Sequence, residues 1–160
     1  MKFSIIFLFL TISGFLVQAQ TNQFKKYQSP MFEIELPVDM RVSKMYNEVS
    51  SDYCDYNVRT SDGYSIMELH SLLNSRFSFR TIGEAYRAAL SSSNLNITYK
   101  FQSGNFFVIS GYNPENGNVV YWKRILGNRF VSDMRLEYSQ SRRALIDSNI
   151  GRIAKSFRSK

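Results

Sequence analysis

The chain has 160 residues, a length that favours a single domain and excludes two independently folded domains of ordinary size. It is 44% hydrophobic and 21% charged and contains 8 Gly and 3 Pro, which excludes a disordered, collagen-like or low-complexity chain. The formal net charge is +7, and one His and one Cys are too few for a structural zinc site built from these residue types.

The first segment of the chain has the pattern of a secretory signal peptide. Lys2 precedes an apolar run over residues 3–17, and Val17 and Ala19 occupy the positions where a signal cleavage site needs small side chains. The run is shorter than the ~20 residues that span a bilayer, which argues against the alternative of a membrane anchor. We therefore predict a signal peptide over 1–19 and a single domain over 20–160, without a transmembrane segment and with a secreted or periplasmic location.

The first part of the predicted domain has the periodicity of strands. Alternating apolar residues before Pro37 predict a strand over 32–37, whereas residues 39–51 lack a clean period and predict a loop or a ragged strand. The pair Asp62-Gly63 predicts a tight turn between strands over 53–59 and 64–73, because these residues tolerate positive φ.

The period changes at Thr81, which has the capping-box spacing to Glu84 and precedes apolar residues at helical spacing, so we expect a helix. Turn-forming residues then separate four expected strands over 97–102, 106–112, 119–126 and 130–138. Apolar residues at 146, 150, 153 and 157 predict a terminal helix with Ser139 or Ser141 as its N-cap. This order predicts an α+β fold, a mainly antiparallel sheet of six to seven strands with two helices.

Four short segments carry a resemblance to a known family. They are residues 32–37 (FEIELP), residues 107–111 (FVISG), residues 121–123 (YWK) and the helix end at residues 156–157 (SF). With these patterns, residues 31–157 resemble secreted members of the PsbP-like superfamily. The resemblance implies an α/β/α sandwich, shared with the extrinsic photosystem proteins and a Ran-binding nuclear import factor. It also implies a non-enzymatic accessory or binding protein, with no catalytic motif to carry over.

Familiar catalytic motifs are absent from the sequence, which has no nucleophile elbow, zinc-binding helix, phosphate loop or dinucleotide-binding turn. Glu68 and His70 are two residues apart on a predicted strand, so both project to one face, where a carboxylate could orient the imidazole. This pair keeps open the alternative of a small secreted hydrolase or lyase, although two solvated side chains have the same spacing. No cofactor and no metal site are predicted.

Positive charge is concentrated at the C-terminal end of the chain. Residues 141–160 contain six basic and one acidic side chains, net +5, whereas residues 21–140 are net +1. On a helical projection, cations lie opposite the apolar positions. The candidate binding residues are Arg142, Arg143, Arg152, Lys155 and Arg158. Because an exported protein is not expected to meet nucleic acid, the expected partner is an acidic protein or an anionic envelope polymer or lipid surface; an ordinary solvated face is the alternative.

A second binding candidate precedes the first helix and consists of Arg76, Phe77, Phe79 and Arg80. Backbone amides at a helix N-terminus favour an anionic group, but paired Phe side chains are also typical of a loop that covers the core. The sequence therefore leaves three classes of function. A non-enzymatic binding or accessory protein is favoured over a hydrolase or lyase that uses Glu68 and His70, and over a structural component of the envelope.

Overall fold

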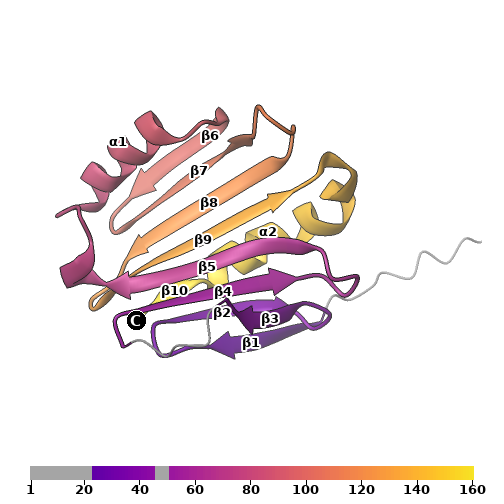
Figure 1. Ribbon diagram of the computed structural model, residues 1–160, viewed down its shortest axis with the longest axis horizontal. Helices are drawn as coiled ribbons and strands as arrows, with labels where there is room; N and C mark the ends of the chain where they lie inside the picture. Colours follow the sequence, from indigo (N-terminus) through magenta and orange to yellow (C-terminus); the bar gives the residue numbers. More distant parts are fainter. Residues whose placement is uncertain (1–22, 46–50) are drawn as a thin grey trace, which may run out of the picture.

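The computed structural model describes residues 23–45 and 51–160, so the predicted signal peptide lies outside the described residues. The described strands form a seven-stranded sheet, in the order β3-β4-β5-β9-β8-β7-β6, and a three-stranded sheet, in the order β1-β2-β10 (Figure 1). All described strand pairs are antiparallel. The elements are β1 (Phe24–Gln28), β2 (Phe32–Pro37), β3 (Arg41–Lys44), β4 (Tyr53–Arg59), β5 (Ser65–Leu73), α1 (Ile82–Ser92), β6 (Asn96–Ser103), β7 (Phe106–Tyr112), β8 (Val119–Leu126), β9 (Phe130–Tyr138), α2 (Arg143–Ser156) and β10 (Arg158–Ser159).

Local sequence signals place most of these elements, and the predicted α+β fold is confirmed. Strands β2, β4, β7, β8 and β9 have the predicted bounds, and the hairpin of β4 and β5 turns at Gly63, whose φ is +82°. In the segment expected as a loop or ragged strand, β3 forms, and residues 46–50 lie outside the described part of the chain.

The two helices begin differently. Helix α1 has the predicted capping box, in which the Thr81 hydroxyl accepts from the Glu84 amide and the Glu84 carboxylate accepts from the Thr81 amide. For α2 the predicted cap is wrong, because Arg142 is the N-cap residue and makes no side-chain capping bond. A short 3₁₀ turn over Gln140–Arg142 precedes this helix, and the Ser139 and Ser141 hydroxyls bond to each other at 2.8 Å instead.

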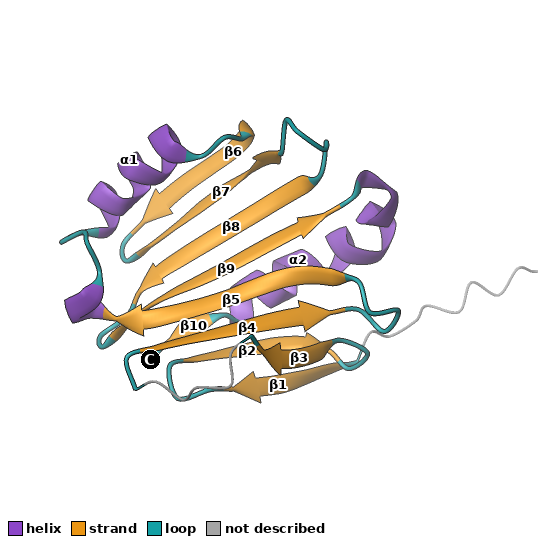
Figure 2. Cartoon of the chain, viewed as in Figure 1, coloured by secondary structure: helices purple, strands orange, loops and turns teal. Residues whose placement is uncertain are grey.

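The helices cover opposite faces of the seven-stranded sheet (Figure 2). Phe107 and Ile109 of β7 pack in a core cluster with α1, whereas Phe106 and Val108 line a groove together with Ala154 of α2. Because successive residues of a strand point to opposite faces, α1 and α2 lie on opposite sides of β7. The result is a layered arrangement with a separate core cluster on each side of the sheet.

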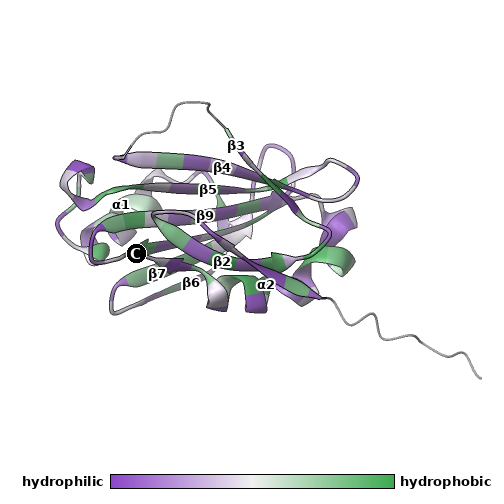
Figure 3. Cartoon of the chain, turned by 90° about the horizontal axis from the view of Figure 1, so that it is seen from below, coloured by the Kyte–Doolittle hydropathy of each residue, from purple (hydrophilic) through white to green (hydrophobic). Residues whose placement is uncertain are grey.

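The three-stranded sheet contains the two strands that sequence patterns did not predict, β1 and β10. Strand β2 lies between β1 and β10 and alternates hydrophobic and hydrophilic residues, as Figure 3 shows. Its hydrophobic residues are buried in the core cluster that also contains Ile146 and Ile153 of α2. The helix ends at Ser156, so Arg158 does not lie on the outer face of the helix as expected. It belongs to β10 instead and pairs with Glu33 of β2.

Candidate functional site

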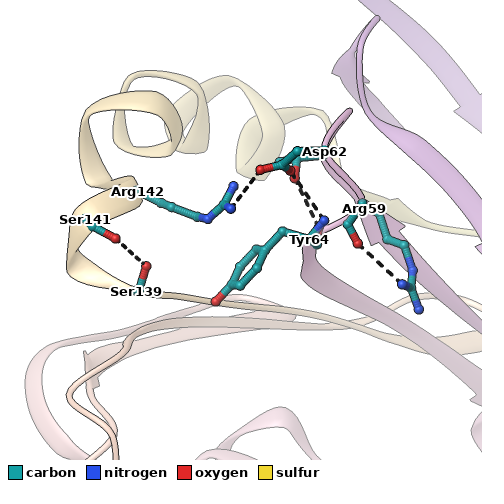
Figure 4. Close-up of polar contacts among 8 residues, drawn as sticks. Arg59, Asp62, Tyr64, Ser139, Ser141 and Arg142 are labelled. Atoms are coloured by element: carbon teal, nitrogen blue, oxygen red, sulfur yellow. Dashed lines mark hydrogen bonds and ion pairs between the residues drawn. The ribbon is translucent and has the colours of Figure 1, made fainter.

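The first of the predicted basic residues is held by contacts inside the protein. The Arg142 Nη2 atom lies 2.8 Å from the Asp62 carboxylate, and the guanidinium lies over the Tyr64 ring, 4.1 Å from its centroid (Figure 4). Hydrogen bonds from Arg142 and Thr60 hold the pKa of Asp62 well below its usual value. This contact therefore ties the start of α2 to the β4–β5 turn and leaves Arg142 poorly available to a partner.

Two further predicted residues are also paired within the chain. Arg143 Nε lies 2.9 Å from Asp147 Oδ2, one helical turn further on. Arg152 Nη2 lies 3.0 Å from Glu35 Oε2 of β2, and its guanidinium lies 4.0 Å from the centroid of the Phe24 ring. Exposed ion pairs stabilise a fold by only about 1 kcal/mol or less, but each removes a free positive charge from the surface.

The last two predicted residues differ from each other. Arg158 donates to the backbone carbonyl oxygens of Lys155 and Phe157. The exposed Lys155 side chain has no ion-pair partner among residues 23–45 and 51–160. The structure thus does not bring the five cations into one free cluster, and it leaves Lys155 as the most available positive charge of α2.

Lys155 lines a groove between α2 and the sheet. The groove has a volume of about 360 Å³ and an apolar floor formed by β6, β7 and β8. Its lining residues are Tyr99, Phe101, Phe106, Val108, Tyr121, Lys123, Gly151, Ala154 and Lys155. The side chains of Tyr99 and Phe101 on the edge strand β6 are 53% and 44% exposed, although large hydrophobic side chains are usually buried. The groove therefore combines exposed aromatic surface with two lysines.

The second lysine, Lys123, is buried at the inner end of this groove. Its Nζ atom donates to the Ala154 carbonyl at 2.5 Å and lies 5.3 Å from the centroid of the Phe106 ring. Burial, with a smaller contribution from Arg158, lowers the pKa of Lys123 from 10.5 to about 8. At neutral pH the ammonium is still charged, and it adds to the positive potential that Lys155 produces at the groove.

The lowered pKa of Lys123 predicts how the free energy of unfolding depends on pH. Because the folded state lowers the pKa of Lys123, the unfolded chain binds more protons between about pH 8 and about pH 10.5, and the residue's contribution to stability rises with pH there. We expect the unfolding free energy of the wild type to increase, relative to that of Lys123→Met, between about pH 7 and about pH 9. Denaturant unfolding of both proteins measures this, and an identical pH dependence of the two would contradict it.

The segment before α1 is a covering loop. Phe77 and Phe79 contact each other edge to face, with ring centroids 5.4 Å apart, and both pack against the core cluster under α1. Arg76 pairs with Asp52 at 2.6 Å, and the Arg80 backbone amide donates to Glu84. The side chains and amides of this second binding candidate are therefore used mainly for core packing, an ion pair and helix capping.

Glu68 and His70, which the alternative hypothesis of a hydrolase or lyase would use, do not form a pair. Glu68 and His70 project to the same face of β5, as expected, but His70 Nδ1 contacts Asp55 on β4 rather than Glu68. A turn centred on Asp62-Gly63 places Asp55 directly opposite His70. The hairpin register therefore allows the contact between Asp55 and His70 to be predicted from the sequence. Among residues 23–45 and 51–160, no group of three His, Cys, Asp or Glu side chains is placed to hold a metal ion.

Comparison with known proteins identifies the fold. No family model and no curated protein matches the chain. Among solved structures, the chain is similar to cyanobacterial PsbP (CyanoP) from Synechocystis sp. PCC 6803, with a TM-score of 0.54 and 12% sequence identity over 89% of this chain and 96% of that chain. Within the described ranges, no helix is long and apolar enough to cross a bilayer. The two helices and antiparallel sheets, together with this similarity, show that the chain has a PsbP-like fold.

Proposed function

We propose that the chain is a secreted or periplasmic, non-enzymatic binding protein that attaches to an anionic lipid surface through the groove at α2. The observation that carries this proposal is the groove itself, which places two exposed aromatic side chains next to Lys155 and Lys123. A lipid surface presents negative head groups above an apolar layer. The groove offers complementary chemistry, because the exposed Lys155 can meet the head groups while the exposed rings of Tyr99 and Phe101 can contact the apolar layer.

The physical basis is the behaviour of amphipathic side chains at membrane interfaces. Tyrosine combines an apolar ring with a polar hydroxyl, which favours the head-group region. A lysine near an anionic surface contributes about 1 kcal/mol of binding free energy. The Lys155 stem can lie along apolar surface while its ammonium reaches the head groups. Tyr99, Phe101 and Lys155 thus form a small interfacial contact that needs no change of fold.

Two observations support this proposal over the alternatives. The cations expected to form a broad basic helix face are mostly paired inside the protein, which favours a smaller contact centred on Lys155. Glu68 and His70, the residues of the alternative hydrolase or lyase hypothesis, are not in contact with each other, because His70 contacts Asp55. A lipid surface also fits the predicted export of the chain better than a nucleic acid does.

Vesicle sedimentation tests the proposal. Wild-type protein is expected to bind phosphatidylglycerol vesicles but not phosphatidylcholine vesicles, and Lys155→Glu is expected to weaken binding at least about fivefold. Binding should also weaken between low and physiological salt, because exposed charges are screened over about 8 Å at physiological ionic strength.

Lys44→Glu is the matched control for this experiment. Lys44 is an exposed lysine on β3, at the opposite edge of the seven-stranded sheet from β6, and it does not line the groove. The control makes the same charge change, so it should bind as the wild type does. Equal losses in the two variants would attribute binding to net charge alone. Wild-type binding that Lys155→Glu leaves unchanged would reject the groove.

A further inference from the structure

A second cleft system lies on the α1 side of the seven-stranded sheet, away from the proposed lipid contact. The strand register aligns Glu68 on β5 with Arg135 on β9, and Arg135 with Trp122 on β8. One acidic, one basic and one aromatic side chain therefore form a row across three neighbouring strands. Helix α1 packs over Phe107 and Ile109 of β7, so this row lies at the edge of the area that the helix covers.

Two clefts meet at Arg135. One, of about 400 Å³, is lined by residues that include Tyr64, Glu68, Asn118 and Glu137. The other, of about 350 Å³, lies between the end of α1, the β7–β8 loop and Trp122. Both volumes fall at the lower end of the range of about 300–1,000 Å³ that is typical of sites for small ligands. Since Arg135 lines both clefts, one elongated ligand can contact both.

The polar wall of these clefts is already ordered. The Glu137 carboxylate accepts from three side-chain amides of the β7–β8 loop, at 3.1 to 3.3 Å. The donors are Asn113, Asn116 and Asn118. Burial alone would raise the pKa of Glu137, but these hydrogen bonds and nearby Arg135 lower it overall. The loop therefore does not need to fold around a ligand, which reduces the entropy that binding would cost.

The aromatic wall is also fixed in orientation. The Trp122 indole Nε1 donates to Asp133 at 2.7 Å, and the Arg124 guanidinium lies 5.1 Å from the centroid of the ring. The Ser93 hydroxyl in the same cleft is buried and has no hydrogen-bond partner among the described residues. A buried hydroxyl without a partner costs free energy, so the wall of this cleft is not fully satisfied within the described residues.

We infer that these clefts bind a neutral oligosaccharide. A sugar hydroxyl both donates and accepts, so it can satisfy the Glu68 carboxylate and the Arg135 guanidinium together. Arg135 Nη2 lies 3.5 Å from Glu137 Oε2, so these two charges already face each other in the cleft wall. An anionic ligand would still meet the carboxylates of Glu68 and Glu115, and a cationic ligand would still meet Arg135. The apolar C–H face of a sugar ring packs against an aromatic ring, the role that Trp122 takes. A neutral polyhydroxylated ligand is therefore the class of ligand that places no charge next to a side chain of the same sign.

Intrinsic fluorescence tests this inference directly, because Trp122 is the single tryptophan of the sequence. The protein is titrated with maltotriose, cellotriose, xylotriose and N-acetylchitotriose, and with trigalacturonate and triglucosamine as charged comparators. At least one neutral trisaccharide should give a saturable change in emission and bind more tightly than either charged one. Arg135→Met should weaken that binding at least about tenfold, because hydrogen bonds to a charged group are lost.

The variant Lys44→Met is the matched control, since it removes one positive charge from the edge strand β3, lines neither cleft and should bind the sugar as the wild type does. Thermal unfolding of each variant verifies that it is folded. The inference is overturned if no neutral trisaccharide gives a saturable change, if a charged comparator binds more tightly, or if Arg135→Met binds like the wild type. The lipid and sugar assays test opposite faces of the sheet. A negative result in one assay therefore does not contradict the proposal that the other assay tests.

Discussion

Replacing Asp133 with alanine is expected to lower the free energy of unfolding by about 3 to 5 kcal/mol. The Asp133 carboxylate accepts from Trp122 Nε1 at 2.7 Å and from Arg124 Nε and Nη2 at 2.7 and 2.9 Å. Its side chain is 10% exposed and that of Arg124 is 17% exposed. The variant would leave a largely buried guanidinium and an indole N–H without their acceptor, and removing one partner of such a pair is costly.

Urea unfolding followed by far-UV circular dichroism measures this loss. The double variant Arg124→Met with Asp133→Leu is expected to recover much of the stability, because apolar residues of similar size replace both members of a buried ion pair at little cost. A second control is Glu115→Ala, an exposed carboxylate on the β7–β8 loop that should change stability by about 0.5 kcal/mol or less. If Asp133→Ala stays within about 1 kcal/mol of the wild type, the pair is not essential to the sheet.

Phe157→Ala is expected to cost a similar amount, about 3 to 5 kcal/mol. The ring is fully buried at the junction of α2 and β10, and its centroid lies 5.9 Å from that of Phe32 on β2. It belongs to the core cluster that joins the small sheet, α2 and one face of the large sheet. Its removal would leave a cavity at the point where these layers meet, and a closed core relaxes little to fill such a space.

Leu145→Ala on α2 is the matched control for Phe157→Ala. Leu145 is 53% exposed, so its truncation should change the unfolding free energy by about 0.5 kcal/mol or less. Guanidinium unfolding at equilibrium compares the two variants. A Phe157→Ala loss as small as the Leu145→Ala loss would mean that the C-terminal segment is not part of the cooperative core.

Most of the fold follows from signals that act over a few residues. The Asp62-Gly63 turn places the β4–β5 hairpin, and the capping box of Thr81 with Glu84 places the start of α1. Such signals depend on backbone preferences and neighbouring hydrogen bonds, which a sequence displays directly. The α+β class follows because strands joined by hairpins leave the two helices outside the sheet.

The small sheet could not be predicted in this way. Strand β1 has only Phe24 and Tyr27 as partly buried aromatic residues, and β10 has two residues, too few for any periodic pattern. Strand β1 forms by pairing in a hairpin with the neighbouring β2, and β10 forms by pairing with the other edge of β2, which is far away in the sequence. Strand formation here depends on tertiary pairing, which outweighs local propensity.

The candidate sites were only partly predictable for the same reason. Arg142 pairs with a carboxylate 80 residues away and Arg152 with one 117 residues away, so a helical projection could not show that these charges are taken up within the fold. The groove combines residues of β6, β7, β8 and α2, which become neighbours only in the folded chain. By contrast, Lys155 was predicted as a binding residue and does line the groove.

Chemical-shift mapping on the ¹⁵N-labelled protein with phosphatidylglycerol nanodiscs tests the lipid-binding groove most directly. We expect the amide signals of Tyr99, Phe101 and Lys155 to broaden or shift on addition of the nanodiscs. The signals of Glu68 and Trp122, whose side chains lie on the opposite face of the sheet, should stay unchanged. Perturbations confined to the opposite face, or to Arg142 and Arg143 at the start of α2, would contradict the proposed binding surface.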